Sequence, residues 1–152
     1  MAHDFKAFPE LTNSQMQLYY FDSPHKQITG DFTAQVVRVI DGDTIRVKAS
    51  FRDFDFPVRL ANIAAAELNE SGGLKSKSWL ENKISNATVE IIVDPQNRVG
   101  KFGRLIGEII AGGLNINEAS MRENSSEAFG ARGFNLFPDF NLELEEFKLK
   151  WL

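Results

Sequence analysis

Cysteine is absent from this 152-residue sequence, and histidine and tyrosine occur twice each. Without cysteine the chain cannot form a disulfide framework, a thiolate zinc site or a cysteine nucleophile. No apolar run is long enough to cross a bilayer, and residues 1–6 show no basic segment followed by an apolar stretch. We therefore expect no signal peptide, no membrane partner and a cytoplasmic location.

Positively charged residues are also fewer than negatively charged ones. The chain has 17 lysines and arginines against 21 aspartates and glutamates, which gives a net charge of −4. Phosphate contacts and counterion release supply most non-specific affinity for nucleic acid, so this balance counts against tight, processive binding. It leaves room for an enzyme with a local basic patch that acts on a short or flexible strand.

What the sequence does contain is enough apolar residues, 43%, for a single core, in a length that suits one domain. Residues 1–31 lack sustained periodicity and are predicted to be an N-terminal extension. A short helix is expected within residues 11–21, capped by Thr12 or Asn13. The aromatic cluster at residues 19–21 is expected to dock this extension on the domain.

From residue 32 onward, β-branched runs separated by turn residues predict a domain over residues 32–137. The expected strands are 33–39, 44–50, 56–62, 88–93 and 104–111, and the expected helices are 74–86 and 115–124. This order predicts a mainly β, α+β fold: a five-stranded Greek-key barrel of the OB type with two or three helices. The segment 138–152 is predicted to be a helix packed on the domain, although its apolar residues also fit strand alternation.

Two motifs suggest chemistry on phosphate groups. Asp41-Gly42-Asp43 places two carboxylates on a turn between β-type runs, a pattern that attracts a hard cation such as Ca²⁺. The alternative is a turn in which both aspartates merely cap backbone groups. Arg59 lies in an apolar strand, where its guanidinium needs an anion, either a phosphate or an internal carboxylate.

Four motifs follow each other in an order that resembles the staphylococcal nuclease, or thermonuclease, family. They are Val39-Ile40-Asp41-Gly42-Asp43-Thr44, Val58-Arg59-Leu60-Ala61-Asn62-Ile63 with Glu67 beyond, Gly100-Lys101-Phe102-Gly103-Arg104, and Asn117-Glu118-Ala119. The resemblance covers about residues 32–124. It implies an OB-fold phosphodiesterase that uses Ca²⁺ to cleave DNA and RNA with little sequence preference, leaving 3′-phosphate ends.

The same resemblance assigns roles at the site. Arg59 and Arg104 would contact the scissile phosphate, and Glu67 would be the base or would position the attacking water. The cation ligands would be Asp43 and the Ala65 carbonyl, with Asp41 in a water-mediated position. An all-oxygen site also suits Mg²⁺ or Mn²⁺.

The nucleotide would also meet the turn that precedes Arg104. Lys101 would lie at a phosphate and Phe102 would stack on a base, in a position where the family often has tyrosine. The alternative is that Lys101 and Phe102 are ordinary loop residues.

One position departs from the family pattern. Where the family has an aspartate that binds the cation, this chain has Ala64. Affinity for a hard dication depends on ligand charge and number, so metal binding and hydrolysis are expected to be impaired or lost. Either the barrel is a natural binding module, or this is an active nuclease whose aspartate at position 64 was changed to alanine. The retained charges of Asp43, Arg59, Glu67 and Arg104 favour the second.

The expected partners are DNA and/or RNA, single-stranded or flexible. A hypothesis from another class is a non-catalytic OB module that binds single-stranded nucleic acid or a protein through the same face. A third hypothesis is that the N-terminal extension, or the apolar C-terminal segment, docks the protein on a larger partner.

Overall fold

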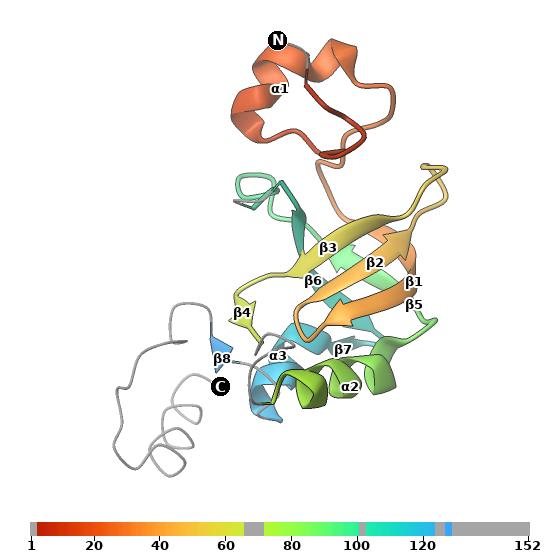
Figure 1. Ribbon diagram of the computed structural model, residues 1–152, viewed down its shortest axis with the longest axis vertical. Helices are drawn as coiled ribbons and strands as arrows, with labels where there is room; N and C mark the ends of the chain where they lie inside the picture. Colours follow the sequence, from red (N-terminus) through yellow and green to blue (C-terminus); the bar gives the residue numbers. More distant parts are fainter. Residues whose placement is uncertain (1–2, 66–71, 101–102, 124–126, 129–152) are drawn as a thin grey trace.

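The barrel is the centre of the computed structural model, which describes residues 3–65, 72–100, 103–123 and 127–128 (Figure 1). Its main strands are β1 (Phe32–Asp41), β2 (Thr44–Lys48), β3 (Phe56–Leu60), β5 (Thr88–Ile92) and β6 (Leu105–Ala111). They bond in the order β3-β2-β1-β5-β6, and β6 closes the ring by pairing with β3 in parallel. The predicted five-stranded OB barrel is confirmed.

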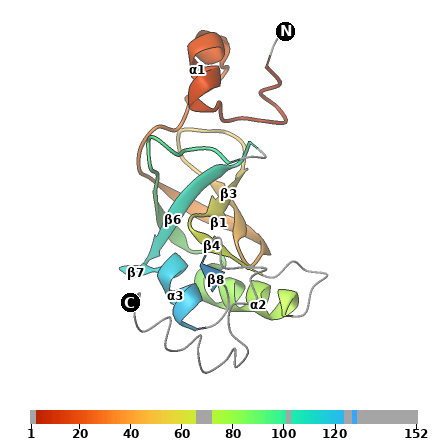
Figure 2. The same ribbon diagram turned by 90° about the vertical axis from the view of Figure 1, so that its left-hand side faces the viewer.

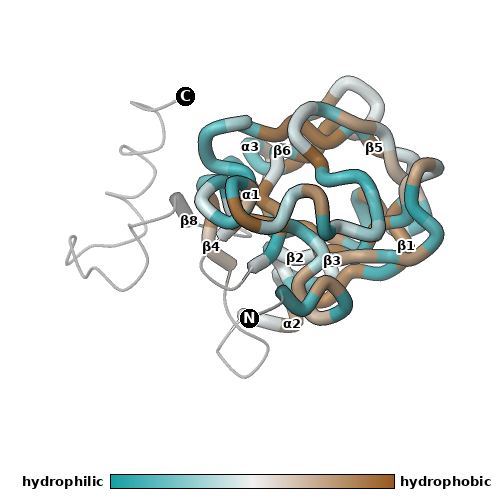
Figure 3. The backbone as a smooth tube through the Cα atoms, turned by 90° about the horizontal axis from the view of Figure 1, so that it is seen from above, coloured by the Kyte–Doolittle hydropathy of each residue, from teal (hydrophilic) through white to brown (hydrophobic). Residues whose placement is uncertain are grey.

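Alternation of side chains explains why these segments form a barrel. Along β2 and β3, Ile45, Val47 and Val58 are fully buried in the interior, while the residues between them lie on the outer side. Seen from above in Figure 3, apolar segments in brown run along β1, β5 and β6. The predicted meander of the first three strands is confirmed as an antiparallel β1-β2-β3 sheet.

Two strands are shorter than expected, each for a local reason. β2 ends at Lys48 because the chain turns at once, with the Arg52 N–H bonded to the Ala49 carbonyl at 3.2 Å. β3 ends at Leu60 because Asn62 adopts a left-handed conformation with φ of 64°, which a strand cannot continue through. In both cases the sequence pattern placed the end of the strand too late, at residues 50 and 62.

Three short strands lie outside the predicted set. β7 (Leu114–Asn115) extends the sheet beside β6, after a turn in which Gly112 and Gly113 have positive φ. β4 (Ile63–Ala64) and β8 (Glu127–Ala128) form a separate two-stranded sheet, in which Ala64 is opposite Glu127. Two-residue strands carry too little periodicity to be recognised in the sequence.

The predicted helices close one end of the barrel, as Figure 2 shows. α2 (Gly73–Ile84) lies between β3 and β5 in the sequence and buries Leu80 and Ile84. α3 (Ile116–Arg122) packs against β6 through Ile116 and Ala119. None of the helices that the structure describes is long and apolar enough to span a membrane.

The N-terminal arm, residues 3–31, lies over the opposite end of the barrel (Figures 1 and 2). It contains α1 (Asn13–Tyr19) and a 3₁₀ turn, η1 (Tyr20–Asp22). Thr12 caps α1 through a reciprocal capping box with Gln15, as predicted. The expected docking by the aromatic cluster is wrong, because Tyr20 is 50% and Phe21 97% exposed.

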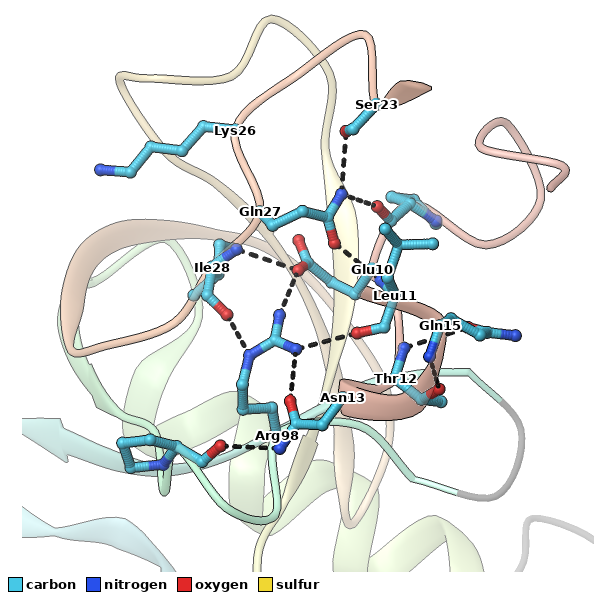
Figure 4. Close-up of polar contacts among 12 residues, drawn as sticks. Glu10, Leu11, Thr12, Asn13, Gln15, Ser23, Lys26, Gln27, Ile28 and Arg98 are labelled. Atoms are coloured by element: carbon cyan, nitrogen blue, oxygen red, sulfur yellow. Dashed lines mark hydrogen bonds and ion pairs between the residues drawn. The ribbon is translucent and has the colours of Figure 1, made fainter. Parts of the chain in front are cut away.

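A buried ion cluster attaches the arm instead. The Glu10 carboxylate pairs with Arg52 of the β2–β3 loop at 2.5 Å and with Arg98 of the β5–β6 loop at 3.0 Å. Arg98 also donates to the carbonyls of Leu11 and Ile28, at 2.8 and 2.6 Å (Figure 4). Burial lowers the pKa of the Arg98 guanidinium, and the negative charge of Glu10 opposes that shift. The ion pair with Glu10 and the two carbonyl bonds thus compensate Arg98 for the water that it loses on burial.

The C-terminal segment 138–152, predicted to be a helix, lies outside the described residues.

Candidate active site

The turn between β1 and β2 carries both carboxylates of the first motif. Asp41 accepts a hydrogen bond from the Asp43 N–H at 3.0 Å, which fixes the turn. Gly42 packs so tightly that a Cβ there would lie 2.6 Å from the Ala65 Cβ and 2.7 Å from the Ser76 Cβ. The glycine therefore lets the turn approach both α2 and the segment after β3.

The Asp43 carboxylate is buried and lies at the centre of the site. One oxygen, Oδ1, accepts the Thr44 hydroxyl at 3.0 Å. The other, Oδ2, accepts the Ala65 N–H at 3.1 Å and faces Arg59 Nη2 at 3.4 Å. Three different segments thus converge on one carboxylate.

The two arginines of the second and third motifs meet at this carboxylate. Arg59 reaches it directly from β3, and Arg104 reaches it through Thr44, whose hydroxyl oxygen accepts from Arg104 Nη1 at 3.2 Å. The parallel pairing of β3 with β6 sets this proximity, because Arg59 is opposite Ile106, two residues beyond Arg104. Although the two arginines are far apart in sequence, the Asp43 carboxylate holds both guanidinium groups, Arg59 directly and Arg104 through Thr44.

The alternative considered for Arg59, an internal ion pair, is seen with Asp43. This pair does not exclude phosphate binding, because an arginine side chain that is 19% exposed can exchange a carboxylate for an incoming anion. Glu67, Lys101 and Phe102 lie outside the described residues, so their assigned roles stay predictions.

The residues at this turn do not by themselves fit a calcium site, because Ca²⁺ takes six to eight oxygens. Both Asp43 oxygens already accept hydrogen bonds from the protein, and Ala64, buried in β4, adds no side-chain oxygen. Among the residues that the structure describes, no three acidic or histidine side chains are grouped to hold a metal. The Ala65 carbonyl and Asp41 as ligands stay predictions.

Two residues of the site were named in motifs without a role. Thr44 links Arg104 to Asp43, and its position directly after the second aspartate was the available signal. Asn117, buried in α3, accepts the Ile109 N–H at 3.1 Å and donates to the Ala61 carbonyl at 2.8 Å. It therefore fixes the start of the segment that carries Ala64 and Ala65.

OB barrels as a class bind oligonucleotides or oligosaccharides on the face of their second and third strands, and here β2 and β3 carry Arg46 and Arg59. Comparison with curated proteins narrows the class. Uncharacterized endonucleases of Escherichia coli and Escherichia coli O157:H7 are each 31% identical over 110 residues, which is 72% of this chain and 67% of theirs.

A micrococcal nuclease of Shigella flexneri is also 31% identical in an alignment of 108 positions, which covers 65% of this chain and 59% of that protein. A comparison with models of protein families gives no match. The curated relatives decide the assignment: the chain belongs to the staphylococcal nuclease family. They support a nuclease function in general.

Proposed function

We propose that this protein binds DNA or RNA at the Asp43, Arg59 and Arg104 site and that it is a phosphodiester-cleaving nuclease whose hydrolysis is impaired by Ala64. The convergence of Arg59 and Arg104 on one buried carboxylate supports the phosphate-binding part. The names of the curated relatives, endonuclease and micrococcal nuclease, support the reaction class.

The chemistry of the two arginines suits a phosphodiester. Hydrolysis adds water across one P–O bond and passes through a five-coordinate phosphorus on which negative charge increases. Guanidinium groups held before the substrate arrives stabilise that charge without reorganisation. Asp43 keeps both arginines in place through direct and Thr44-mediated contacts. Glu67, the proposed base, would take the proton of the attacking water.

Ca²⁺ is the proposed cofactor of the active form, with Mg²⁺ or Mn²⁺ as alternatives. It would supply Lewis-acid stabilisation, and an aspartate at position 64 would provide the carboxylate that the described residues lack. We therefore propose that this chain keeps phosphate affinity while cleaving slowly or not at all.

The test is cleavage of denatured DNA, with and without millimolar Ca²⁺, by this protein and by its Ala64→Asp variant. We expect the variant to gain Ca²⁺-stimulated cleavage of at least about 100-fold, because a metal ion contributes several kcal/mol to such a reaction. Ala64→Asn, of nearly the same shape and without charge, is the matched control and should gain nothing. Thermal unfolding checks that each variant is folded.

The alternative is a non-catalytic module that binds single-stranded nucleic acid or a protein partner, and the two partnered oxygens of Asp43 favour it. If this alternative holds, this protein and its Ala64→Asp variant should both bind nucleic acid, and neither should cleave it. Arg104→Gln then reports on the site itself, since the affinity for nucleic acid should fall both in a nuclease and in a module that binds single-stranded nucleic acid, but not in a module that binds only a protein partner.

A further inference from the structure

Basic side chains continue from the phosphate site along the outer face of β2. Thr44, which is opposite Arg59, begins the row, and Arg46 and Lys48 follow on the same side, because alternate residues of a strand share a face. Four residues of strand span about 13 Å. The row therefore leads from the arginines toward the end of the barrel that the arm covers.

β1 adds a second cation to this face. Arg38 is directly opposite Arg46 in the antiparallel pair, next to a register shift in β1. Like charges in opposite positions destabilise a sheet unless something neutralises them. Asp55 pairs with Arg46 at 2.7 Å, and the exposed Arg38 has no ion pair among the described residues. The face thus retains an excess of positive charge.

The row ends at a pocket of about 480 Å³ between the arm and the β2–β3 loop. His25 of the arm lines it on one side, and Lys48, Ser50 and Phe51 line it on the other. Its volume is within the range of about 300–1,000 Å³ that small-molecule sites occupy. It presents the Ser50 hydroxyl and the Lys48 ammonium, which also donates to the Ala49 and Arg52 carbonyls, beside the Phe51 ring. Such donors can bind a phosphate and such a ring can stack on a base.

The charge around the pocket favours an anion. Arg52, which also lines it, is fully buried and shares the single carboxylate of Glu10 with Arg98. Arg52 Nε and Nη1 have no hydrogen-bond partner in the described part of the chain. Two buried arginines against one glutamate leave one positive charge, which Asp53 at the pocket rim offsets. Lys48 in the pocket wall then gives the pocket a net positive charge.

The phenyl side chain of the pocket, Phe51, lies in its exposed part. Phe51 is 37% exposed, and Lys26 of the arm lies over its ring, 5.2 Å from the centroid. A base can stack against a partly exposed phenyl ring. The flexible Lys26 chain can turn from the ring to a phosphate.

We propose that a single strand of nucleic acid, bound at Arg59 and Arg104, continues across Arg46 and Arg38 and places a further nucleotide in the pocket between Lys48, Phe51 and the arm. This second subsite makes the arm part of the substrate-binding surface. The inference rests on the proposed function, since the arginine site holds the other end of the strand.

The experiment compares two probes by fluorescence competition and calorimetry: thymidine 3′,5′-bisphosphate, which fills the arginine site alone, and an oligothymidylate of about eight nucleotides. The intact protein should bind the long probe at least about tenfold more tightly. Lys26→Gln and Arg38→Gln, both at exposed side chains, should each weaken the long probe about two- to fivefold. Each should also reduce the salt slope by about 0.7.

The control is Arg122→Gln, an exposed arginine on α3 at the other end of the barrel. It removes the same charge and should leave both affinities unchanged. Equal affinity for the two probes, or equal losses in all three variants, would overturn the proposed path. If the bisphosphate does not bind at all, the proposed function fails. The path fails with it in that case, because the strand would have no anchor at Arg59 and Arg104.

Discussion

At the residue scale, Asp43 gathers the site because its two oxygens hold groups from three segments: Thr44, Ala65 and Arg59. Such convergence requires that the backbone of the turn lie close to the segment after β3. Gly42 provides that proximity, since any larger residue would overlap Ala65 and Ser76.

Gly42→Ala should therefore destabilise the fold by about 1–3 kcal/mol, the usual cost of forcing a carbon into a packed interior. Urea unfolding measures the effect as a lower midpoint. Gly30→Ala is the matched control, because a Cβ at Gly30 has nothing within 4 Å. Equal stability of the two variants would show that the turn does not need its glycine.

At the scale of elements, α3 positions the β3 end of the site through one side chain. Asn117 bonds to Ile109 and Gly107 of β6 and to Ala61 beyond β3. These strands form the parallel pair that closes the barrel. The helix thus stabilises the junction from which Ala64 and Ala65 reach the Asp43 turn.

Asn117→Ala should cost about 2–4 kcal/mol, because it leaves more than one buried backbone group without a partner. Thermal or urea unfolding gives the value. Arg122→Ala, on the exposed side of the same helix, should change stability by less than about 1 kcal/mol. A small effect at Asn117 would mean that water or neighbouring groups replace its bonds.

At the scale of the whole molecule, the arm and the barrel form one unit through the Glu10, Arg52 and Arg98 cluster, of which Figure 4 shows Glu10 and Arg98. The two arginines come from loops on different sides of the barrel end, so one arm residue links both. Phe8 of the arm also contacts the turn before Arg104, where a Cβ on Gly103 would lie 2.7 Å from the Phe8 ring. The arm therefore supports the loop that leads into the site.

Glu10→Gln should lower the free energy of unfolding by about 3–5 kcal/mol, because it leaves two buried guanidinium groups without a counter-charge. Urea titration measures this loss. Glu90→Gln, at an exposed position of β5, is the control and should be nearly neutral. A near-neutral Glu10→Gln would show that the carbonyl bonds of Arg98 suffice to hold the arm.

The barrel and the identity of its charged residues were determined by the sequence, because strand alternation, turn residues and ordered motifs are local signals. The tertiary structure alone decided how they combine: the β3–β6 pairing that brings Arg59 near Arg104, Thr44 as their link, and Glu10 as the anchor of the arm. Glu10 belongs to a segment without periodicity, and its partners are 42 and 88 residues away. Contacts of that span depend on how the chain closes on itself, which no local pattern encodes.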